Sequence, residues 1–121
     1  MARILFVDDD TVSLETLSRA TEILGHEPVT AITGDQALLL ANNQSFDLIF
    51  SDIQLQDIDG FQLLERFRES DDCNSVPIFI LSASPAIDVV ERSLAAGATA
   101  YIAKPLRLET LEEIIEEYCK A

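Results

Sequence analysis

The stretch RILFVDDD, residues 3–10, is the most informative part of the chain, because a short apolar run ends abruptly in three carboxylates. Four consecutive apolar residues without polar alternation are typical of a strand that is buried on both faces of a parallel sheet. Residues 48–51 and 78–81 have the same character, and residues 29–32 and 100–103 are weaker versions. We therefore expect five strands.

Amphipathic stretches separate these apolar runs. Apolar side chains at helical spacing predict a first helix that Gly25 closes, a second near residues 35–42 and a last one over residues 108–118. Asp59 is expected to cap the third helix and Ser84 the fourth. Strands that alternate with helices favour an α/β fold: a parallel sheet covered on both faces, doubly wound into a three-layer sandwich.

The composition limits what the chain can do. Its 121 residues are enough for one domain, and 48% are hydrophobic. Eight basic residues against 22 acidic ones give a net charge of −14, so we expect binding to neither nucleic acid nor a membrane. Cys73 and Cys119 lack metal or redox spacing, which favours free thiols in a reducing, cytoplasmic environment.

Polar residues follow four of the five predicted strands. Asp8 and Asp9 follow the first strand and Asp52 follows the third, whereas Ser82 and Lys104 follow the fourth and the fifth. The carboxyl ends of parallel strands meet at one edge of a sheet, where ligands bind. Carboxylates suit Mg²⁺, and a lysine and a hydroxyl add groups that hold phosphoryl oxygens. This set predicts a phosphoryl-binding site in which an aspartate acts as the nucleophile.

Each of these residues also has an ordinary structural explanation when it is taken alone. The carboxylates of residues 8–10 could form a turn and cap the first helix, and Asp52 could be a loop residue. Ser82 could belong to a turn, and Lys104 could mark the exit from a strand. The position of all of them at the same end of the predicted sheet favours a shared site.

Five ordered motifs resemble response-regulator receiver domains, which have the CheY-like fold, over essentially the whole chain. The motifs are ILFVDDD at residues 4–10, DLIFSD at 47–52, DIDGF at 57–61, ILSA at 80–83 and GATAYIAKP at 97–105. The resemblance implies a single receiver domain over residues 1–121, with the flavodoxin-like strand order 2-1-3-4-5.

The resemblance also implies a role for each site residue. Asp52 would accept a phosphoryl group from a phosphohistidine of a histidine kinase or a phosphotransfer protein. Mg²⁺ would be bound by Asp8, Asp9 and Asp52, with the backbone carbonyl of Gln54 as a further ligand. Lys104 would pair with the phosphoryl group.

A switch is implied as well. Ser82 would hydrogen-bond the phosphoryl group, and Tyr101 would turn inward as Ser82 moves. The face formed by the fourth helix, fifth strand and fifth helix would then contact a downstream effector protein. Many receivers dimerise through this same face, so a homodimer is an alternative. The protein would catalyse its own phosphorylation and slow dephosphorylation without being a classical turnover enzyme.

One position departs from the family pattern. Receivers usually carry proline four residues after the phosphoacceptor, whereas this chain has Gln56. Proline fixes φ, so glutamine loosens the loop or changes its contacts with the kinase, but it removes no group that the chemistry needs. Gln54 and Ser84 occupy positions at which the family tunes the phosphate lifetime.

Two other functions fit parts of the pattern. Residues 8–12 resemble the first motif of haloacid-dehalogenase-type Mg²⁺ phosphatases, in which Asp8 would be the nucleophile and Asp10 the acid and base. That family places an acidic pair after its lysine, and none follows Lys104 at a strand end. The second alternative is an interaction scaffold that is not phosphorylated, against which the complete set of acceptor residues argues.

Overall fold

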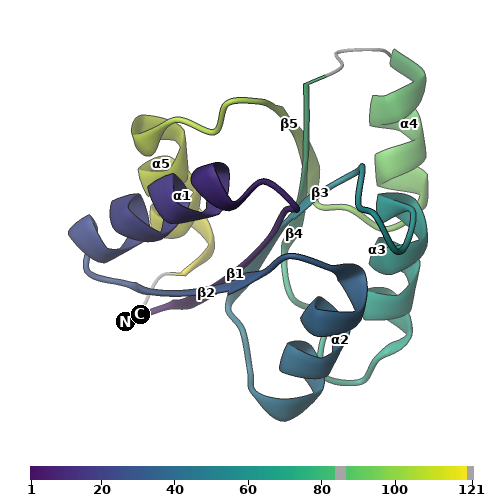
Figure 1. Cartoon of the computed structure of the whole chain (residues 1–121), viewed down its shortest axis with the longest axis horizontal. Coiled ribbons are helices and arrows are strands. Elements are labelled where there is room, and N and C mark those ends of the chain that lie inside the picture. The colour runs from purple at the N-terminus through teal and green to yellow at the C-terminus, as the bar shows by residue number, and fades with distance from the viewer. Residues whose placement is uncertain (84–86, 120–121) are drawn as a thin grey trace.

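The computed structural model describes residues 1–83 and 87–119, in which five strands alternate with five helices (Figure 1). The elements are β1 Arg3–Val7, α1 Thr11–Ile23, β2 Glu27–Ala31, α2 Gly34–Asn43, β3 Leu48–Asp52, α3 Gly60–Glu69, β4 Ile78–Ser82, α4 Ile87–Ala95, β5 Ala100–Ala103 and α5 Leu108–Tyr118.

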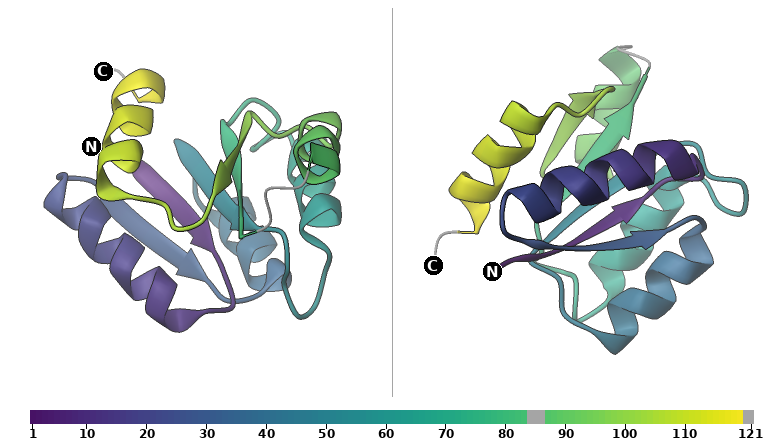
Figure 2. Two further views of the ribbon diagram at one scale, coloured as in Figure 1. Left: turned by 90° about the horizontal axis from the view of Figure 1, so that it is seen from above. Right: turned by 60° about the vertical axis from the view of Figure 1, so that its left-hand side comes forward.

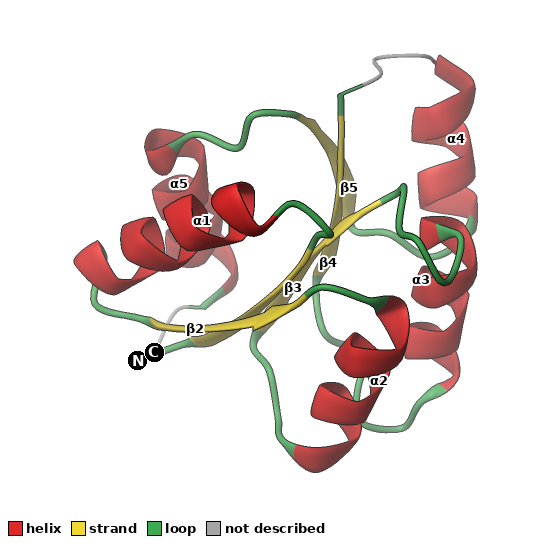
Figure 3. Cartoon of the chain, in the orientation of Figure 1, coloured by secondary structure: helices red, strands yellow, loops and turns green. Residues whose placement is uncertain are grey.

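The strands form one parallel sheet in the order β2-β1-β3-β4-β5, which confirms the predicted topology (Figure 3). Helices α1 and α5 cover one face of the sheet, and α2, α3 and α4 cover the other, as the views from above and from the side agree (Figure 2). The molecule is therefore the expected three-layer sandwich. Val7 pairs with Ala31 on one side and Ser51 on the other, so the carboxyl ends of these strands lie together.

The position of β2 differs from the prediction, because β2 covers Glu27–Ala31 rather than residues 29–32. Its start is set by β1: Arg3 is the register partner of Glu27 and forms an ion pair with it at 2.8 Å. Pro28 lacks an N–H donor, which a strand tolerates at the edge of a sheet, where β2 lies. An apolar-run criterion therefore misses the first two residues.

Strands β3 and β4 lie inside the sheet and are completely buried, and together with β1 they supply a large part of the core. Every residue of β3 and β4 is buried. On the side of α1 and α5, the rings of Phe6, Phe50 and Phe79 stack across three neighbouring strands, with centroids 5.4 and 5.2 Å apart, and Tyr118 of α5 meets Phe79 edge-on. This packing gives the carboxyl ends of the strands a rigid support.

Side-chain caps begin three of the helices. Asp10 caps α1, Thr33 caps α2 and Asp59 caps α3, the last as predicted. The predicted cap of the fourth helix, Ser84, lies outside the described residues. Gly25, with φ of +87°, follows α1 as expected, because glycine adopts this left-handed conformation at little cost.

The helices and the two cysteines have further features that bear on the setting of the protein. In the part of the chain that the structure describes, no helix has the length and apolar character that crossing a membrane requires. Cys73 is buried and Cys119 is half-buried, and both are free thiols, as predicted.

Candidate functional site

Three of the predicted carboxylates meet at the carboxyl ends of β1 and β3. Asp8, Asp9 and Asp52 each offer an oxygen, and these oxygens lie within 4.8 Å of one another. The parallel pairing of β1 with β3 places them there, because Asp8 directly follows the strand whose register partner ends in Asp52. Asp8 and Asp52 are only 2% and 8% exposed, whereas Asp9 is exposed at the rim.

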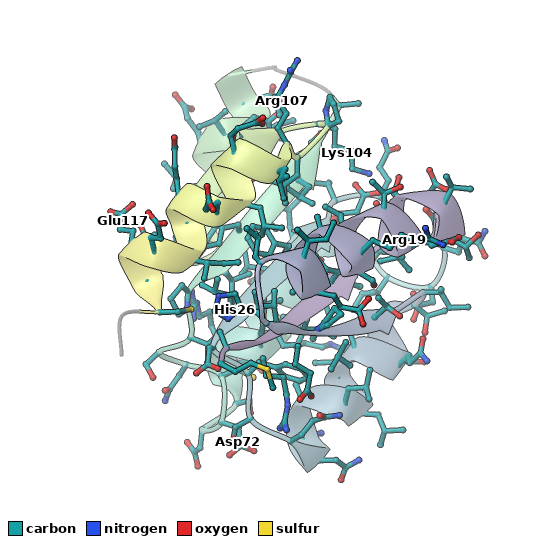
Figure 4. All side chains as sticks on the ribbon, turned by 90° about the vertical axis from the view of Figure 1, so that its left-hand side faces the viewer. Arg19, His26, Asp72, Lys104, Arg107 and Glu117 are labelled. Atoms are coloured by element: carbon teal, nitrogen blue, oxygen red, sulfur yellow. The ribbon has the colours of Figure 1, made fainter. Side chains whose placement is uncertain are left out.

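Lys104, which lies near the other end of the chain, contacts two of these carboxylates. Its Nζ donates to Asp8 Oδ2 at 2.9 Å and to Asp52 Oδ2 at 3.0 Å, although Asp8 is 96 residues away. The backbone N–H of Lys104 donates to Ser82 O at 2.8 Å, which fixes the lysine to the end of β4. Lys104 lies between α1 and the start of α5 (Figure 4).

The charges of this group are not balanced. Burial raises the pKa of Asp52 above its usual 3.8, and the hydrogen bond from Lys104 offsets this only in part. Burial alone would lower the pKa of Lys104, but the hydrogen bonds to Asp8 and Asp52 raise it above its usual 10.5. One ammonium therefore serves two buried carboxylates, while Asp9 adds a third negative charge beside them.

The residues present fit a magnesium ion. The three carboxylate oxygens are hard ligands of the kind that Mg²⁺ prefers, and one of them is solvent-exposed, which suits an ion that keeps several waters. An added divalent cation would also offset the burial that raises the pKa of Asp52, together with the smaller repulsion from Asp8. The donor set and its charge thus agree with the predicted metal ligands.

The loop after β3 turns back tightly beside Asp52. The backbone N–H of Gln54 donates to Asp52 Oδ1 at 3.3 Å, and Gln54 forms an isolated bridge with Asp59. The N–H of Gly60 donates to Ile53 O at 2.7 Å. A Cβ on Gly60 would lie 2.5 Å from Ile53 Cα, so this close return requires glycine. The backbone of Gln54 is therefore held next to the predicted phosphoacceptor.

The two predicted switch residues are in contact. Ser82 is buried at the end of β4, and its carbonyl accepts a hydrogen bond from the Tyr101 hydroxyl at 3.4 Å. Tyr101 is half-buried on β5 and is the register partner of Ile80. The segment that carries Ser82 is thereby linked both to Lys104 and to Tyr101.

Asp10 stands apart from the cluster of carboxylates. Its Oδ1 accepts from the N–H of Val12 at 3.0 Å, and its Oδ2 accepts from the Ser13 hydroxyl at 2.9 Å. The hydrogen bonds from Ser13 lower the pKa of Asp10 below 3.8. The capping interpretation therefore holds for Asp10, and the acid–base role that the phosphatase alternative gives it has no support in this geometry.

Sequence reasoning missed two features of the site. One is a cavity of about 430 Å³ beside Lys104, whose apolar lining includes Val12, Leu17 and Leu106. The other is a pair of hydrogen bonds from the start of α2 to Asp57. Neither has a signal in the local sequence, because each depends on segments that only the fold brings together.

Comparison with known proteins identifies the family. The model of the response regulator receiver domain matches residues 4–116, which is most of the chain. This chain belongs to the response-regulator receiver family. It is a receiver domain of two-component signalling, a class of signalling domains distinct from classical enzymes.

Similar proteins include two receiver domains of known structure and a longer regulatory protein. The chemotaxis protein CheY4 of Vibrio cholerae is 30% identical, covers 98% of both chains and has a TM-score of 0.92. The receiver domain of a sensor histidine kinase from Pseudomonas aeruginosa, with a magnesium ion coordinated in its active site cleft, is 29% identical over 97% of this chain and 96% of that one, with a TM-score of 0.88. A gliding motility regulatory protein of Myxococcus xanthus is 34% identical over 94% of this chain. The chain spans only 15% of the length of that protein and less than half the length of four other curated relatives that it matches.

Proposed function

We propose that this receiver takes a phosphoryl group on Asp52, with Mg²⁺ present, from a phosphohistidine of a histidine kinase or a phosphotransfer protein. The observation that carries the proposal is the bridging position of Lys104, whose ammonium bonds both Asp8 and Asp52 while Asp9 lies beside them. A buried aspartate that is next to a cation and to two further carboxylates is suited to nucleophilic attack on a phosphorus atom.

The transfer step is a displacement at phosphorus. A carboxylate oxygen of Asp52 forms a bond to phosphorus as the bond from phosphorus to the histidine nitrogen breaks, and the imidazole takes up a proton from solvent. Lys104 is already within hydrogen-bonding distance of Asp52 and can pair with the oxygens of the new group. Asp8, Asp9, Asp52 and the carbonyl of Gln54 would hold Mg²⁺, which supplies positive charge against the phosphoryl oxygens.

The segment that carries Ser82 would pass the effect of phosphorylation on to the surface that binds partners. The Ser82 hydroxyl would hydrogen-bond the phosphoryl group, and the contact between Ser82 O and Tyr101 would transmit the change to β5. The face formed by α4, β5 and α5 would then bind a downstream effector protein or a second copy of the chain. Slow self-dephosphorylation of Asp52 would end the signal.

The wider setting is also part of the proposal. Residues 1–121 act as one receiver domain, and its setting is cytoplasmic, where free thiols persist. The net charge of −14 favours partners with basic surfaces over nucleic acid or anionic lipid.

Transfer from a kinase tests the proposal. Histidine kinases labelled with radioactive phosphate are mixed with the wild type, with Asp52→Ala and with Asp8→Asn. We expect at least one kinase to label the wild type and none to label Asp52→Ala, whereas Asp8→Asn is labelled more slowly because Asp8 holds the metal rather than the phosphate. Label that persists in Asp52→Ala would overturn the assignment.

A further inference from the structure

The loop between β3 and α3 is fastened to a helix that lies more than 20 residues away in the sequence. The Asp57 carboxylate accepts hydrogen bonds from the backbone N–H of Gly34 at Oδ1 and of Asp35 at Oδ2, both at 2.9 Å. These N–H groups belong to the first turn of α2, where helical N–H groups have no partner within the helix. Thr33 caps the same turn by accepting from Gln36 N at 3.1 Å. Asp57 therefore supplies a second cap for α2 from another segment.

The approach of the loop to α2 requires glycine at the start of the helix. A Cβ on Gly34 would overlap Cγ2 of Ile58 and would lie 3.6 Å from Asp57 Oδ1. Ile58 in turn packs against the core on this side of the sheet. The hydrogen bonds from Gly34 and Asp35 also lower the pKa of Asp57 below 3.8, so the carboxylate is charged at neutral pH. The contact thus combines two charge-assisted hydrogen bonds with close packing.

The same loop carries the backbone of Gln54, which lies beside Asp52. The two ends of the loop are joined to each other by the hydrogen bond from Gly60 N–H to Ile53 O and by the bridge between Gln54 and Asp59. Asp57 holds the tip of the loop on α2. We call the two hydrogen bonds from Gly34 and Asp35 to Asp57 the clamp at Asp57. By holding the tip of the loop, the clamp limits how far the Gln54 backbone can move.

Apart from the packing of Leu55 and Ile58 against the core, little else stiffens the tip. Residues 53–59 contain no proline, so no φ angle in them is fixed covalently. Gln56 is exposed, and its side chain forms no hydrogen bond to residues 1–83 or 87–119. Side-chain contacts must therefore order this part of the loop, and Asp57 contributes two hydrogen bonds from α2.

We propose that Asp57 is a positioning residue for the phosphorylation of Asp52, because it holds on α2 the loop whose Gln54 backbone lies beside Asp52. The inference rests on the proposed function, and Asp57 itself touches none of the reacting groups. It acts as an outer support of a metal site, and loss of such supports typically weakens metal binding by about ten- to a hundredfold.

The test compares three variants of the full chain. Asp57→Ala removes both hydrogen bonds, Asp57→Asn keeps an oxygen for one of them, and Thr33→Ala removes the other cap of α2 without touching the loop. Phosphorylation of Asp52 by acetyl phosphate is followed at increasing Mg²⁺ concentrations by separation of the phosphorylated form. In this reaction an Asp52 oxygen displaces acetate from phosphorus.

We expect Asp57→Ala to raise the half-saturating Mg²⁺ concentration about tenfold while the rate at saturating Mg²⁺ is retained. Asp57→Asn should lie between this variant and the wild type. Thr33→Ala should keep the Mg²⁺ dependence of the wild type, although it weakens α2. Faster amide hydrogen exchange of residues 53–59 in Asp57→Ala, without Mg²⁺, would support the same conclusion.

Two results would overturn the proposal for Asp57. One is an unchanged Mg²⁺ dependence in both Asp57 variants, and the other is an equal shift in Thr33→Ala, which would reduce Asp57 to a stabiliser of α2. A wild type that takes no phosphate at any Mg²⁺ concentration would instead overturn the proposed function, so the two failures are distinguishable.

Discussion

Asp52 is the side chain at which stability conflicts with the proposed function. Its pKa is raised by burial, so the folded protein binds a proton at Asp52 more tightly than the unfolded chain does. The contribution of Asp52 to stability is therefore greatest below pH 3.8, and it falls as the pH rises from 3.8 through the raised value of the folded state. At neutral pH the ionised carboxylate costs stability.

Replacing Asp52 with asparagine should consequently stabilise the protein at neutral pH without Mg²⁺. We expect the free energy of unfolding in urea to rise by on the order of 1 kcal/mol, because Lys104 keeps its bond to Asp8. Addition of Mg²⁺ should raise the stability of the wild type and affect Asp52→Asn less, since the variant lacks one ligand. A variant that is less stable than the wild type at neutral pH and more stable at acidic pH would contradict this account.

Lys104 is the counter-ion of the two buried carboxylates. Its side chain is 26% exposed, so solvent weakens the effect of its removal. Lys104→Met should lower the free energy of unfolding by about 2 kcal/mol, because Asp8 and Asp52 lose their shared cation. Phosphorylation of Asp52 by acetyl phosphate should slow by about a hundredfold.

The matched control for Lys104 is Arg19→Met. Arg19 pairs with Glu15 at 3.1 Å on the surface of α1, and both side chains are well exposed. Such pairs contribute less than about 1 kcal/mol, so this variant should behave like the wild type in both measurements. Equal losses in the two variants would show that the effect of Lys104 is not specific to the site.

The start of α1 separates a structural aspartate from the site aspartates next to it. Asp10 caps the helix, whereas Asp9 offers an oxygen to the carboxylate cluster. Asp10→Ala should lower the free energy of unfolding by about 1 kcal/mol and leave the phosphorylation of Asp52 intact. Asp9→Ala should show the reverse, with a higher half-saturating Mg²⁺ concentration and little change in urea unfolding. Loss of phosphorylation in Asp10→Ala would reopen a catalytic role for Asp10.

The strands show which parts of the site a sequence can predict. Asp8 and Asp52 follow apolar runs directly, and the rule that parallel strands align their carboxyl ends is enough to bring them together. The clamp at Asp57 could not be found in this way. It depends on the absence of a side chain at Gly34 and on the docking of a loop against a helix that starts more than 20 residues earlier. The apolar pattern also misses the start of β2, because that start depends on the pairing of Glu27 with Arg3 of β1 and not on the local sequence.

For the molecule as a whole, the proposed switch joins the buried site at one edge of the sheet to the surface that we propose binds partners. The connection runs from Ser82 at the end of β4 to Tyr101 on β5. Beryllofluoride with Mg²⁺, which mimics a phosphoryl group, should therefore shift the amide resonances of Tyr101 and of the neighbouring residues of α4 and α5. Asp52→Asn serves as the control and should show no such shifts. Shifts confined to the residues next to Asp52 would favour an interaction scaffold without a switch.

The identity of the modified residue separates the receiver from the phosphatase alternative. The wild type is incubated with acetyl phosphate and Mg²⁺, the adduct is trapped chemically, and the modified residue is located by mass spectrometry of peptides. We predict one phosphoryl group, on Asp52, which forms only with Mg²⁺ and is absent from Asp52→Asn. A phosphoryl group on Asp8, or none on any aspartate, would contradict the account.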